Sequence, residues 1–189
     1  MKIAKRIFMY ILIGVLSIPI FVIAYFYITW KSIIIDENLP KQAIYKTFDH
    51  QKQESIFGGE SDKNKTNNFR IKIDSLEGQY FSCSVYNYRP FLKIYLSIGD
   101  GFSGGGYDID IVNNRYKLSP YYYTDVIKPF DFFESEEYYK ILNKKLILNK
   151  DSYKKGDSIF GYIELKIQKR YGPEKYFEEG KGYFKAVVE

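Results

Sequence analysis

Apolar residues form one long run at the start of the chain, from Ile7 to Trp30, and no charged residue interrupts it. As a helix rising about 1.5 Å per residue, this run would extend roughly 36 Å, which exceeds the hydrocarbon core of a bilayer at about 30 Å. We therefore expect residues 7–30 to form a transmembrane helix in contact with the lipid bilayer.

The charges beside this run predict its orientation. Lys2, Lys5 and Arg6 precede it, whereas Lys31 is the single cation between the run and the acidic residues 36–37. Cationic flanks favour the cytoplasmic side of a membrane. We therefore expect residues 1–6 in the cytoplasm and the rest of the chain in the periplasm or outside the cell. The residues expected at the membrane interfaces are Lys5, Arg6, Tyr25, Tyr27 and Trp30.

A cleaved signal peptide is the alternative interpretation of this run. Its apolar core usually spans about 7–15 residues and ends at small residues. Here the run is longer, and residues 24–27 read Ala-Tyr-Phe-Tyr, which is too bulky for a cleavage site. The pattern favours an uncleaved signal anchor.

The membrane-proximal segment, residues 31–68, is predicted to contain a short helix and a polar stalk. The helix is expected over residues 40–54, because Pro40 suits a first helical turn and Ala43, Ile44 and Phe48 would then share one side. Residues 55–68 are polar and rich in turn formers, so we expect a stalk or a mobile loop there.

From residue 69 onward, apolar and polar residues alternate with a period of two, and turn residues separate the runs. This pattern predicts strands, and no helical pattern is long enough for crossovers between parallel strands. We predict a mainly β domain over residues 69–189, an antiparallel β-sandwich or small barrel of about eight strands. The positions expected to face its core include Phe81, Cys83, Val85, Leu92, Ile94, Leu96, Ile98, Ile109, Ile111, Leu142, Leu146, Leu148, Ile159, Ile163, Leu165, Ile167, Phe184, Ala186 and Val188.

The net charge of +5 gives little support to nucleic-acid binding. Three cations lie within the first six residues, so residues 31–189 carry only +2. A nucleic-acid partner is therefore not expected. A local basic cluster is either a solvated edge or a surface that attracts an anionic partner; its members are Lys144, Lys145, Lys150, Lys154 and Lys155.

Cys83 is the only cysteine, so no intrachain disulfide can form. It shares one face of an alternating run with Phe81 and Val85, which favours a buried thiol over a reactive one. Stability must then come from the core, to which a 19% aromatic content contributes large apolar side chains.

The glycine-rich stretch of residues 97–106, Ser-Ile-Gly-Asp-Gly-Phe-Ser-Gly-Gly-Gly, has the glycine spacing of a dinucleotide-binding loop at Gly99, Gly101 and Gly104. That site needs a helix after the last glycine, where the phosphate would lie. An alternating run follows instead. We therefore predict a flexible connection between adjacent strands, with Phe102 exposed, and no cofactor.

The acidic residues near this stretch allow one metal hypothesis. Asp108 and Asp110 would point to the same side of a strand, and Asp100 could join them as a third oxygen ligand for calcium. Outward polar positions on a half-buried strand have the same pattern, so no metal site is predicted.

Other catalytic constellations are missing from the sequence. His50 is the only histidine and lies in the membrane-proximal segment, which disfavours a catalytic triad and a zinc site. Carboxylate-only catalysis stays open, although no spacing indicates it; the acids concerned are Asp108, Asp110, Glu134, Glu136 and Glu137. No catalytic residue is predicted.

Tyrosines concentrate between residues 95 and 123. Aromatic faces can form a platform for a sugar or a protein partner, although packing within the sheets is the alternative. Consecutive residues on a strand point to opposite faces, so Tyr121, Tyr122 and Tyr123 cannot all lie on one surface. The residues assigned to a weak candidate binding surface are Phe102, Tyr107, Tyr121, Tyr122 and Tyr123.

These observations predict a membrane-anchored cell-envelope protein whose non-catalytic β domain binds a protein or a glycan. One alternative is an immunity or inhibitor protein that neutralises a toxin in the periplasm, and another is a carboxylate-dependent hydrolase.

Overall fold

The computed structural model describes residues 2–48, 50–54, 60–64, 70–73, 81–99, 102–124, 138–171 and 173–189. Its elements, in chain order, are α1 (Lys2–Thr29), β1 (Lys31–Ser32), β2 (Ile34–Ile35), the 3-10 helices η1 (Leu39–Lys41) and η2 (Ala43–Lys46), β3 (His50–Glu54), β4 (Glu60–Asn64), β5 (Arg70–Ile73), β6 (Ser82–Tyr88), β7 (Phe91–Gly99), β8 (Ser103–Val112), β9 (Arg115–Thr124), β10 (Tyr138–Leu148), β11 (Ser158–Tyr171) and β12 (Glu174–Val187).

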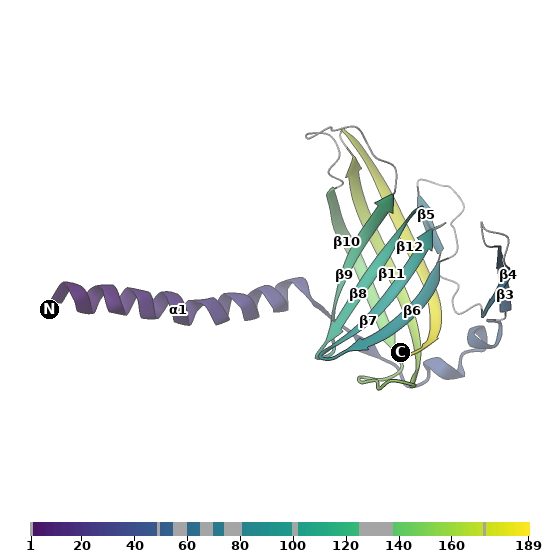
Figure 1. Cartoon of the computed structure of the whole chain (residues 1–189), viewed down its shortest axis with the longest axis horizontal. Coiled ribbons are helices and arrows are strands. Elements are labelled where there is room, and N and C mark those ends of the chain that lie inside the picture. Colours follow the sequence, from purple (N-terminus) through teal and green to yellow (C-terminus); the bar gives the residue numbers. More distant parts are fainter. Residues whose placement is uncertain are drawn as a thin grey trace.

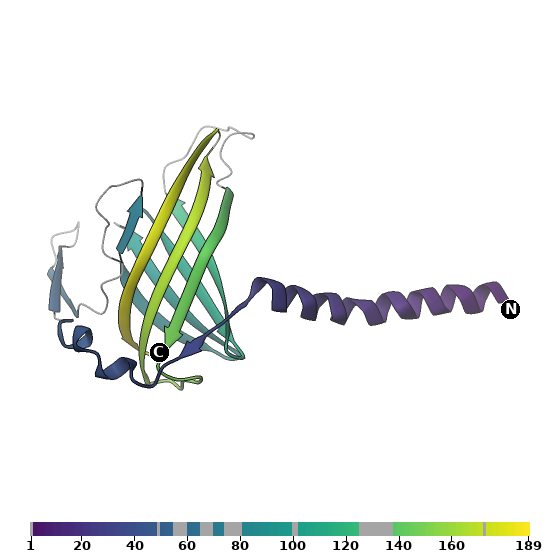
Figure 2. The same ribbon diagram turned by 180° about the vertical axis from the view of Figure 1, so that it is seen from behind.

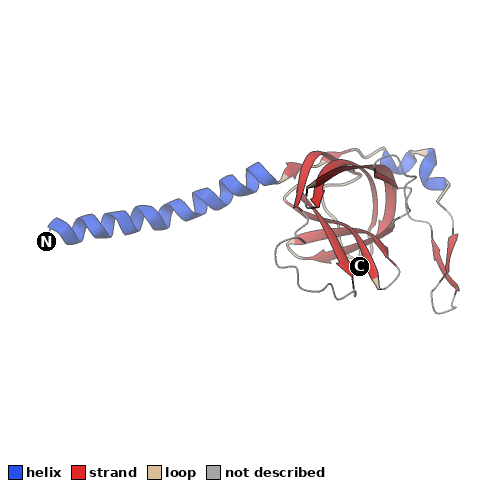
Figure 3. Ribbon diagram, turned by 90° about the horizontal axis from the view of Figure 1, so that it is seen from above, coloured by secondary structure: helices blue, strands red, loops and turns tan. Residues whose placement is uncertain are grey.

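Two five-stranded sheets form the body of the protein, which confirms the predicted mainly β fold. The first sheet has the order β1-β9-β8-β7-β6 (Figure 1), and the second, seen from behind in Figure 2, has the order β2-β10-β11-β12-β5. Most neighbouring strands are antiparallel. The two sheets curve around a shared interior (Figure 3), so the domain resembles both a sandwich and a small barrel.

The chain that leaves α1 passes from one sheet to the other. Lys31 and Ser32 pair with Tyr116 and Arg115 of β9, whereas β2 pairs in parallel with the end of β10. The two short strands thus contact β9 and β10, which lie in different sheets.

A second junction between the sheets lies at β6 and the residues that follow β12. Val85 forms a parallel bridge with Val188. The Asn87 amide donates a hydrogen bond to the Glu189 carbonyl at 3.0 Å, and the Glu189 amide donates one to the Val85 carbonyl at 3.0 Å. Residues 188–189 are therefore part of the fold.

The core between the sheets follows the predicted alternation. Nearly all the expected positions on β7, β8, β11 and β12 are buried, and Phe81 and Cys83 pack against them. The side chains of this core that expose 2% of their surface or less are Val85, Ile94, Leu96, Ile109, Tyr116, Leu118, Leu146, Leu148, Ile159, Ile163, Leu165, Ile167, Phe184 and Val188. Burial of large apolar side chains at about 25 cal/mol per Å² is the main stabilising contribution.

Leu142 was predicted to face the core but is exposed. The register of β10 against β11 shifts between Ile141 and Asn143, so Leu142 is the extra residue of a β-bulge. The bulge changes the phase of the strand, and Ile141 packs against the core in place of Leu142.

The membrane-proximal segment differs from the predicted helix and stalk. Residues 31–35 belong to the sheets, and residues 39–46 form two 3-10 helices rather than one helix over 40–54. Leu39 and Tyr45 are buried, and the Tyr45 hydroxyl donates a hydrogen bond to the Gly161 carbonyl at 3.0 Å. Leu39 and Tyr45 of the membrane-proximal segment therefore pack on the domain that was predicted to begin at residue 69.

Residues 50–64 also differ from that prediction. β3 and β4 form an antiparallel hairpin where the end of a helix and a polar stalk were expected. Residues 55–59 and 65–69 lie outside the described residues.

The glycine-rich stretch connects two adjacent antiparallel strands, as predicted, but most of its residues belong to those strands. Gly99 ends β7, and residues 103–106 begin β8, where they pair with both β7 and β9. Asp100 and Gly101 lie outside the described residues.

Lys169 and Glu178 form an ion pair within the core region. The Lys169 ammonium is 3.1 Å from the Glu178 carboxylate, and these side chains expose only 13% and 7% of their surface. The Tyr107 hydroxyl donates a hydrogen bond to the same carboxylate. A buried charge needs such partners, because desolvation of an unpaired charge costs several kcal/mol.

α1 is long and apolar enough over Met9–Thr29 to cross a membrane, and no part of this stretch is buried against the rest of the protein. Its end is held by the domain. The Arg115 guanidinium donates a hydrogen bond to the Trp30 carbonyl and lies 4.4 Å from the Tyr27 ring centroid. A cation at a helix C-terminus also interacts favourably with the helix dipole.

Candidate functional site

The outer face of the first sheet carries a group of aromatic and acidic side chains. Because successive residues of a strand point to opposite sides, the neighbours of the core residues on β6–β9 point outward. We call this surface the tyrosine–aspartate face, and we define it by Tyr86, Tyr88, Tyr95, Asp108 and Tyr121.

The strand register brings these residues together from four strands. Tyr95 of β7 lies opposite Asp108 of β8, which lies opposite Ser119 of β9. On the other side of Tyr95, the register partner is Ser84 of β6. Hydroxyl groups therefore flank an aromatic ring and a carboxylate in one row across the sheet.

The tyrosines at one edge of this face contact each other. The ring centroids of Tyr86 and Tyr88 are 5.7 Å apart with nearly parallel planes, at 19°. Tyr86 and Tyr95 have the same centroid distance in an edge-to-face arrangement, at 69°. Tyr88 exposes 56% of its surface and lies at the end of this group, so one ring is open to solvent.

Glycines on β8 make room for the tyrosines on β9. A Cβ atom at Gly104 would lie 2.6 Å from the Tyr123 hydroxyl oxygen and 2.7 Å from its ring carbon, so the Tyr123 ring covers this glycine. A Cβ atom at Gly106, the register partner of Tyr121, would collide with the Leu96 carbonyl oxygen. Gly104 and Gly106 thus have a packing function within β8.

The two aspartates of the face have different environments. The Lys93 ammonium lies 3.1 Å from Asp110, and this contact raises the pKa of Lys93. Asp108 has no such partner among the described residues, and one of its carboxylate oxygens is buried without a hydrogen bond. Burial, and then the charge of Asp110, raise the pKa of Asp108.

Burial also raises the pKa of Tyr95 and Tyr121, and the nearby charge of Asp108 adds to the effect on both. Both phenols are therefore neutral hydrogen-bonding groups near neutral pH. Together with Asp108, they provide hydroxyl donors and carboxylate acceptors beside aromatic rings.

The structure separates the residues predicted to form a binding surface. Tyr121 and Tyr123 lie on the outer face, while Tyr122 points to the other side of β9 and is 60% exposed. Phe102 is exposed, as predicted, at the far end of the sheet from Arg115. Tyr107 was misassigned, because its side chain points into the core and is only 3% exposed.

The calcium hypothesis finds limited support. Asp108 and Asp110 do share one face of β8, but Asp100 lies outside the described residues. Among the described residues, no group of three or more His, Cys, Asp or Glu side chains is arranged to hold a metal ion.

The residues expected at the membrane interfaces all lie on or directly after α1. Lys5 and Arg6 belong to its first turns, and Tyr25 and Tyr27 are about 60% exposed, at 61% and 60%. Trp30 is half-buried, with its ring centroid 6.4 Å from that of Phe91.

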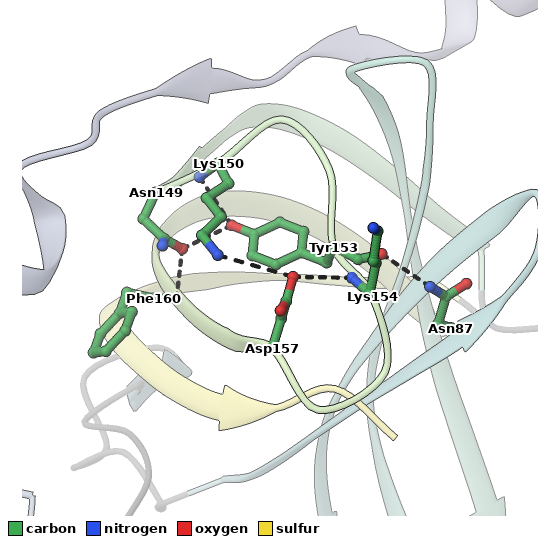
Figure 4. Close-up of polar contacts among 7 residues, drawn as sticks. All are labelled: Asn87, Asn149, Lys150, Tyr153, Lys154, Asp157 and Phe160. Atoms are coloured by element: carbon green, nitrogen blue, oxygen red, sulfur yellow. Dashed lines mark hydrogen bonds and ion pairs between the residues drawn. The ribbon is translucent and has the colours of Figure 1, made fainter.

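The loop between β10 and β11 is held by a polar network (Figure 4). The Asn149 amide oxygen accepts hydrogen bonds from the Tyr153 hydroxyl at 2.7 Å and the Phe160 amide at 2.9 Å. The Asn87 side chain donates to the Tyr153 carbonyl at 3.0 Å, which ties the loop to β6. A cavity of about 400 Å³ adjoins Tyr153.

The lysines of the basic cluster that was noted in the sequence lie in different parts of the structure. Asp157 lies 3.8 Å from the Lys150 ammonium and accepts a hydrogen bond from the Lys154 amide at 3.0 Å. Lys144 instead lies on β10, where it faces the end of α1 and donates a hydrogen bond to the Thr29 carbonyl at 3.2 Å.

Comparison with known proteins returned no match among protein-family models, curated proteins or solved structures.

Sequence reasoning missed Tyr86 and Tyr88 in the site and Lys169 and Glu178 in the core. Both tyrosines lie on β6 on the side that faces away from Val85 and the core. The period of two could therefore have predicted that they point outward. The same period places Lys169 and Glu178 on the core-facing sides of their strands, but their pairing depends on the approach of β11 to β12.

Proposed function

We propose that this protein is a membrane-anchored cell-envelope protein whose β domain binds a partner, without catalysis, on the tyrosine–aspartate face. In this proposal α1 spans the membrane with its N-terminus in the cytoplasm, and the domain lies in the periplasm or outside the cell. The charge asymmetry around α1 supports the orientation. The convergence of Tyr86, Tyr88, Tyr95, Asp108 and Tyr121 on one face supports the binding role.

The chemistry of this face favours a glycan as the partner. The C–H groups of a sugar ring pack on an aromatic face, for which the exposed ring of Tyr88 is available. Sugar hydroxyls hydrogen-bond with carboxylates and hydroxyls, which Asp108 and Ser119 provide in the same row. A few polar groups beside apolar rings are the usual composition of a small-molecule site.

Binding of cell-envelope oligosaccharides to the full-length protein in neutral detergent micelles tests this proposal. Isothermal titration calorimetry should detect saturable binding of at least one member of a glycan panel. Tyr88→Ala and Asp108→Asn should each weaken it by about tenfold or more, which corresponds to about 1.4 kcal/mol.

Tyr138→Ala is the matched control, because Tyr138 is 63% exposed but lies on β10 of the other sheet. It should leave the affinity unchanged. The glycan proposal fails if no member of the panel binds, or if the control weakens binding as much as Tyr88→Ala does.

A carboxylate-dependent hydrolase is a second candidate, favoured by the raised pKa of Asp108 beside Asp110. Against it, both acids project from the same side of one strand, whereas glycoside hydrolysis needs two acids on either side of the bond that breaks. Saturable turnover of an oligosaccharide that is lost in Asp108→Asn would support the hydrolase and contradict the non-catalytic proposal.

A further inference from the structure

A groove lies where the end of α1 meets the two sheets, between β9 and β10. Its volume is about 450 Å³, and it is lined by Tyr25, Ile28 and Thr29 of α1, by Lys31, and by residues 117–118, 139 and 141–144. Because β9 and β10 belong to different sheets, the groove follows the opening between them. We call it the lysine groove.

Three lysines line this groove, namely Lys31, Lys117 and Lys144, and none of the lining residues is acidic. The aspartate opposite Lys117 in the strand register is Asp110, which already pairs with Lys93 at 3.1 Å. Within the described residues, the groove therefore has an excess of positive charge.

The positions of two of these cations are held by backbone contacts. Lys144 donates a hydrogen bond to the Thr29 carbonyl at 3.2 Å, and its ammonium lies 5.1 Å from the Tyr116 ring centroid. Lys31 donates to the Lys144 carbonyl at 2.6 Å. The ammonium groups are thus kept near each other before any ligand arrives, which lowers the entropy cost of binding an anion.

The pKa of Lys144 reflects its position in the groove. Burial lowers the pKa of this lysine, and the charges of Lys31 and Lys117 lower it further. An anion in the groove would relieve this repulsion, because an opposite charge at close range favours the charged form of a lysine.

The other side of the groove is apolar and continuous with the membrane helix. Ile28 is 83% exposed and Tyr25 is 61% exposed on α1, and the bulge residue Leu142 is 43% exposed on β10. Tyrosine is enriched where a helix leaves a membrane. The groove therefore combines cations with exposed apolar side chains beside the end of α1.

We propose that the lysine groove binds the phosphate of an anionic phospholipid in the membrane leaflet that the end of α1 reaches. Lys31, Lys117 and Lys144 contact the phosphate oxygens, and Tyr25, Ile28 and Leu142 pack against the first part of an acyl chain. This inference rests on the membrane anchor of the proposed function and is independent of the tyrosine–aspartate face.

Native mass spectrometry of the full-length protein in neutral detergent micelles tests the proposal. Phosphatidylglycerol and phosphatidylcholine are titrated separately, and the fraction of protein with one bound lipid is compared. Each lysine near an anionic headgroup contributes about fivefold in affinity. The unsubstituted protein should therefore bind phosphatidylglycerol more than about tenfold more tightly than phosphatidylcholine. The triple variant Lys31→Gln, Lys117→Gln, Lys144→Gln should lose most of that preference.

The matched control removes the same charge elsewhere. Lys154, Lys155 and Lys175 are exposed and lie outside the groove, so their triple replacement by glutamine should keep the preference. Equal affinity for the two lipids, a groove variant that keeps its preference, or a control that loses as much would each overturn the proposal.

Two further arms keep the test decisive. Inorganic phosphate at millimolar concentration should not displace the lipid, and displacement would show a site for a free anion instead. Lys117→Gln removes one cation without breaking the contacts of Lys144 and Lys31, and it should still lower the preference about fivefold if the triple variant does not fold.

Extraction of cell membranes with alkaline carbonate tests the anchor separately, since an anchored protein stays in the pellet.

Discussion

Gly161 in β11 gives a sharp test of how the core is packed. Its register partner across the sheet is Phe184 of β12, whose side chain is fully buried. A Cβ atom at Gly161 would collide with the Phe184 ring. The ring therefore occupies the space that a side chain at residue 161 would need, and Gly161→Ala forces the ring to move.

The loss of stability depends on how the Phe184 ring responds to the added methyl group. If the surrounding core yields, overpacking of this kind costs about 1–3 kcal/mol. If the ring leaves the core, the cost approaches that of Phe→Ala truncation, about 3–5 kcal/mol. We expect Gly161→Ala to lower the free energy of unfolding by about 2–4 kcal/mol.

Urea unfolding of the full-length protein in neutral detergent, followed by circular dichroism, measures this loss. The second variant is Phe184→Leu, because leucine lacks the outer ring atoms that collide. The double variant should be more stable than Gly161→Ala by about 1 kcal/mol or more, as a double-mutant cycle would show.

Gly156→Ala is the contrasting control. Gly156 has open space around its Cβ position but a φ of +89°, so alanine there is strained by the backbone alone. Phe184→Leu should not rescue it. A Gly161→Ala protein within about 0.5 kcal/mol of the original, or one that Phe184→Leu fails to rescue, would refute the packing argument.

Three further predictions follow from the described contacts. Because the pKa of Asp108 is raised in the folded protein, folding takes up a proton there, and the free energy of unfolding should fall as pH rises from about 4 through the raised value. Asp108→Asn should remove this decline. Urea unfolding of the variant at acidic and neutral pH measures it, and a free energy of unfolding that still falls with pH would contradict the prediction. Burial raises the pKa of the Cys83 thiol to about 12, so Ellman's reagent should react at mildly alkaline pH only after unfolding, and rapid reaction of the folded protein would contradict this. Arg115→Ala should increase the rate of proteolysis after Trp30 several-fold, measured by limited chymotrypsin digestion, whereas unchanged cleavage would show that Arg115 does not hold the end of α1.

The period of two was enough to predict which side of most strands faces the core. Ile159, Ile163 and Ile167 are buried as expected because a strand that is regular over its whole length keeps its phase. Leu142 fails because one inserted residue shifts the phase, and nothing in the local pattern marks the insertion.

The candidate site was predictable only in part, for a similar reason. Asp108 and Asp110 were correctly placed on one side of their strand, since that depends only on local alternation. Their combination with Tyr86 and Tyr121 depends on which strands are neighbours and in which register, and the period of a single strand contains no such information. Lys31, Lys117 and Lys144 are also far apart in the sequence and meet only through the fold.

The passage of residues 31–35 between the sheets has a practical consequence for soluble versions of the domain. A chain begun after residue 36 would lack β1 and β2, and the partners that they leave behind are backbone groups of β9 and β10. Unpaired strand edges recruit other strands, which leads to aggregation. An aggregating fragment would therefore say nothing about the stability of the intact domain, and secretion or crystallisation should start from a fragment that begins no later than Lys31.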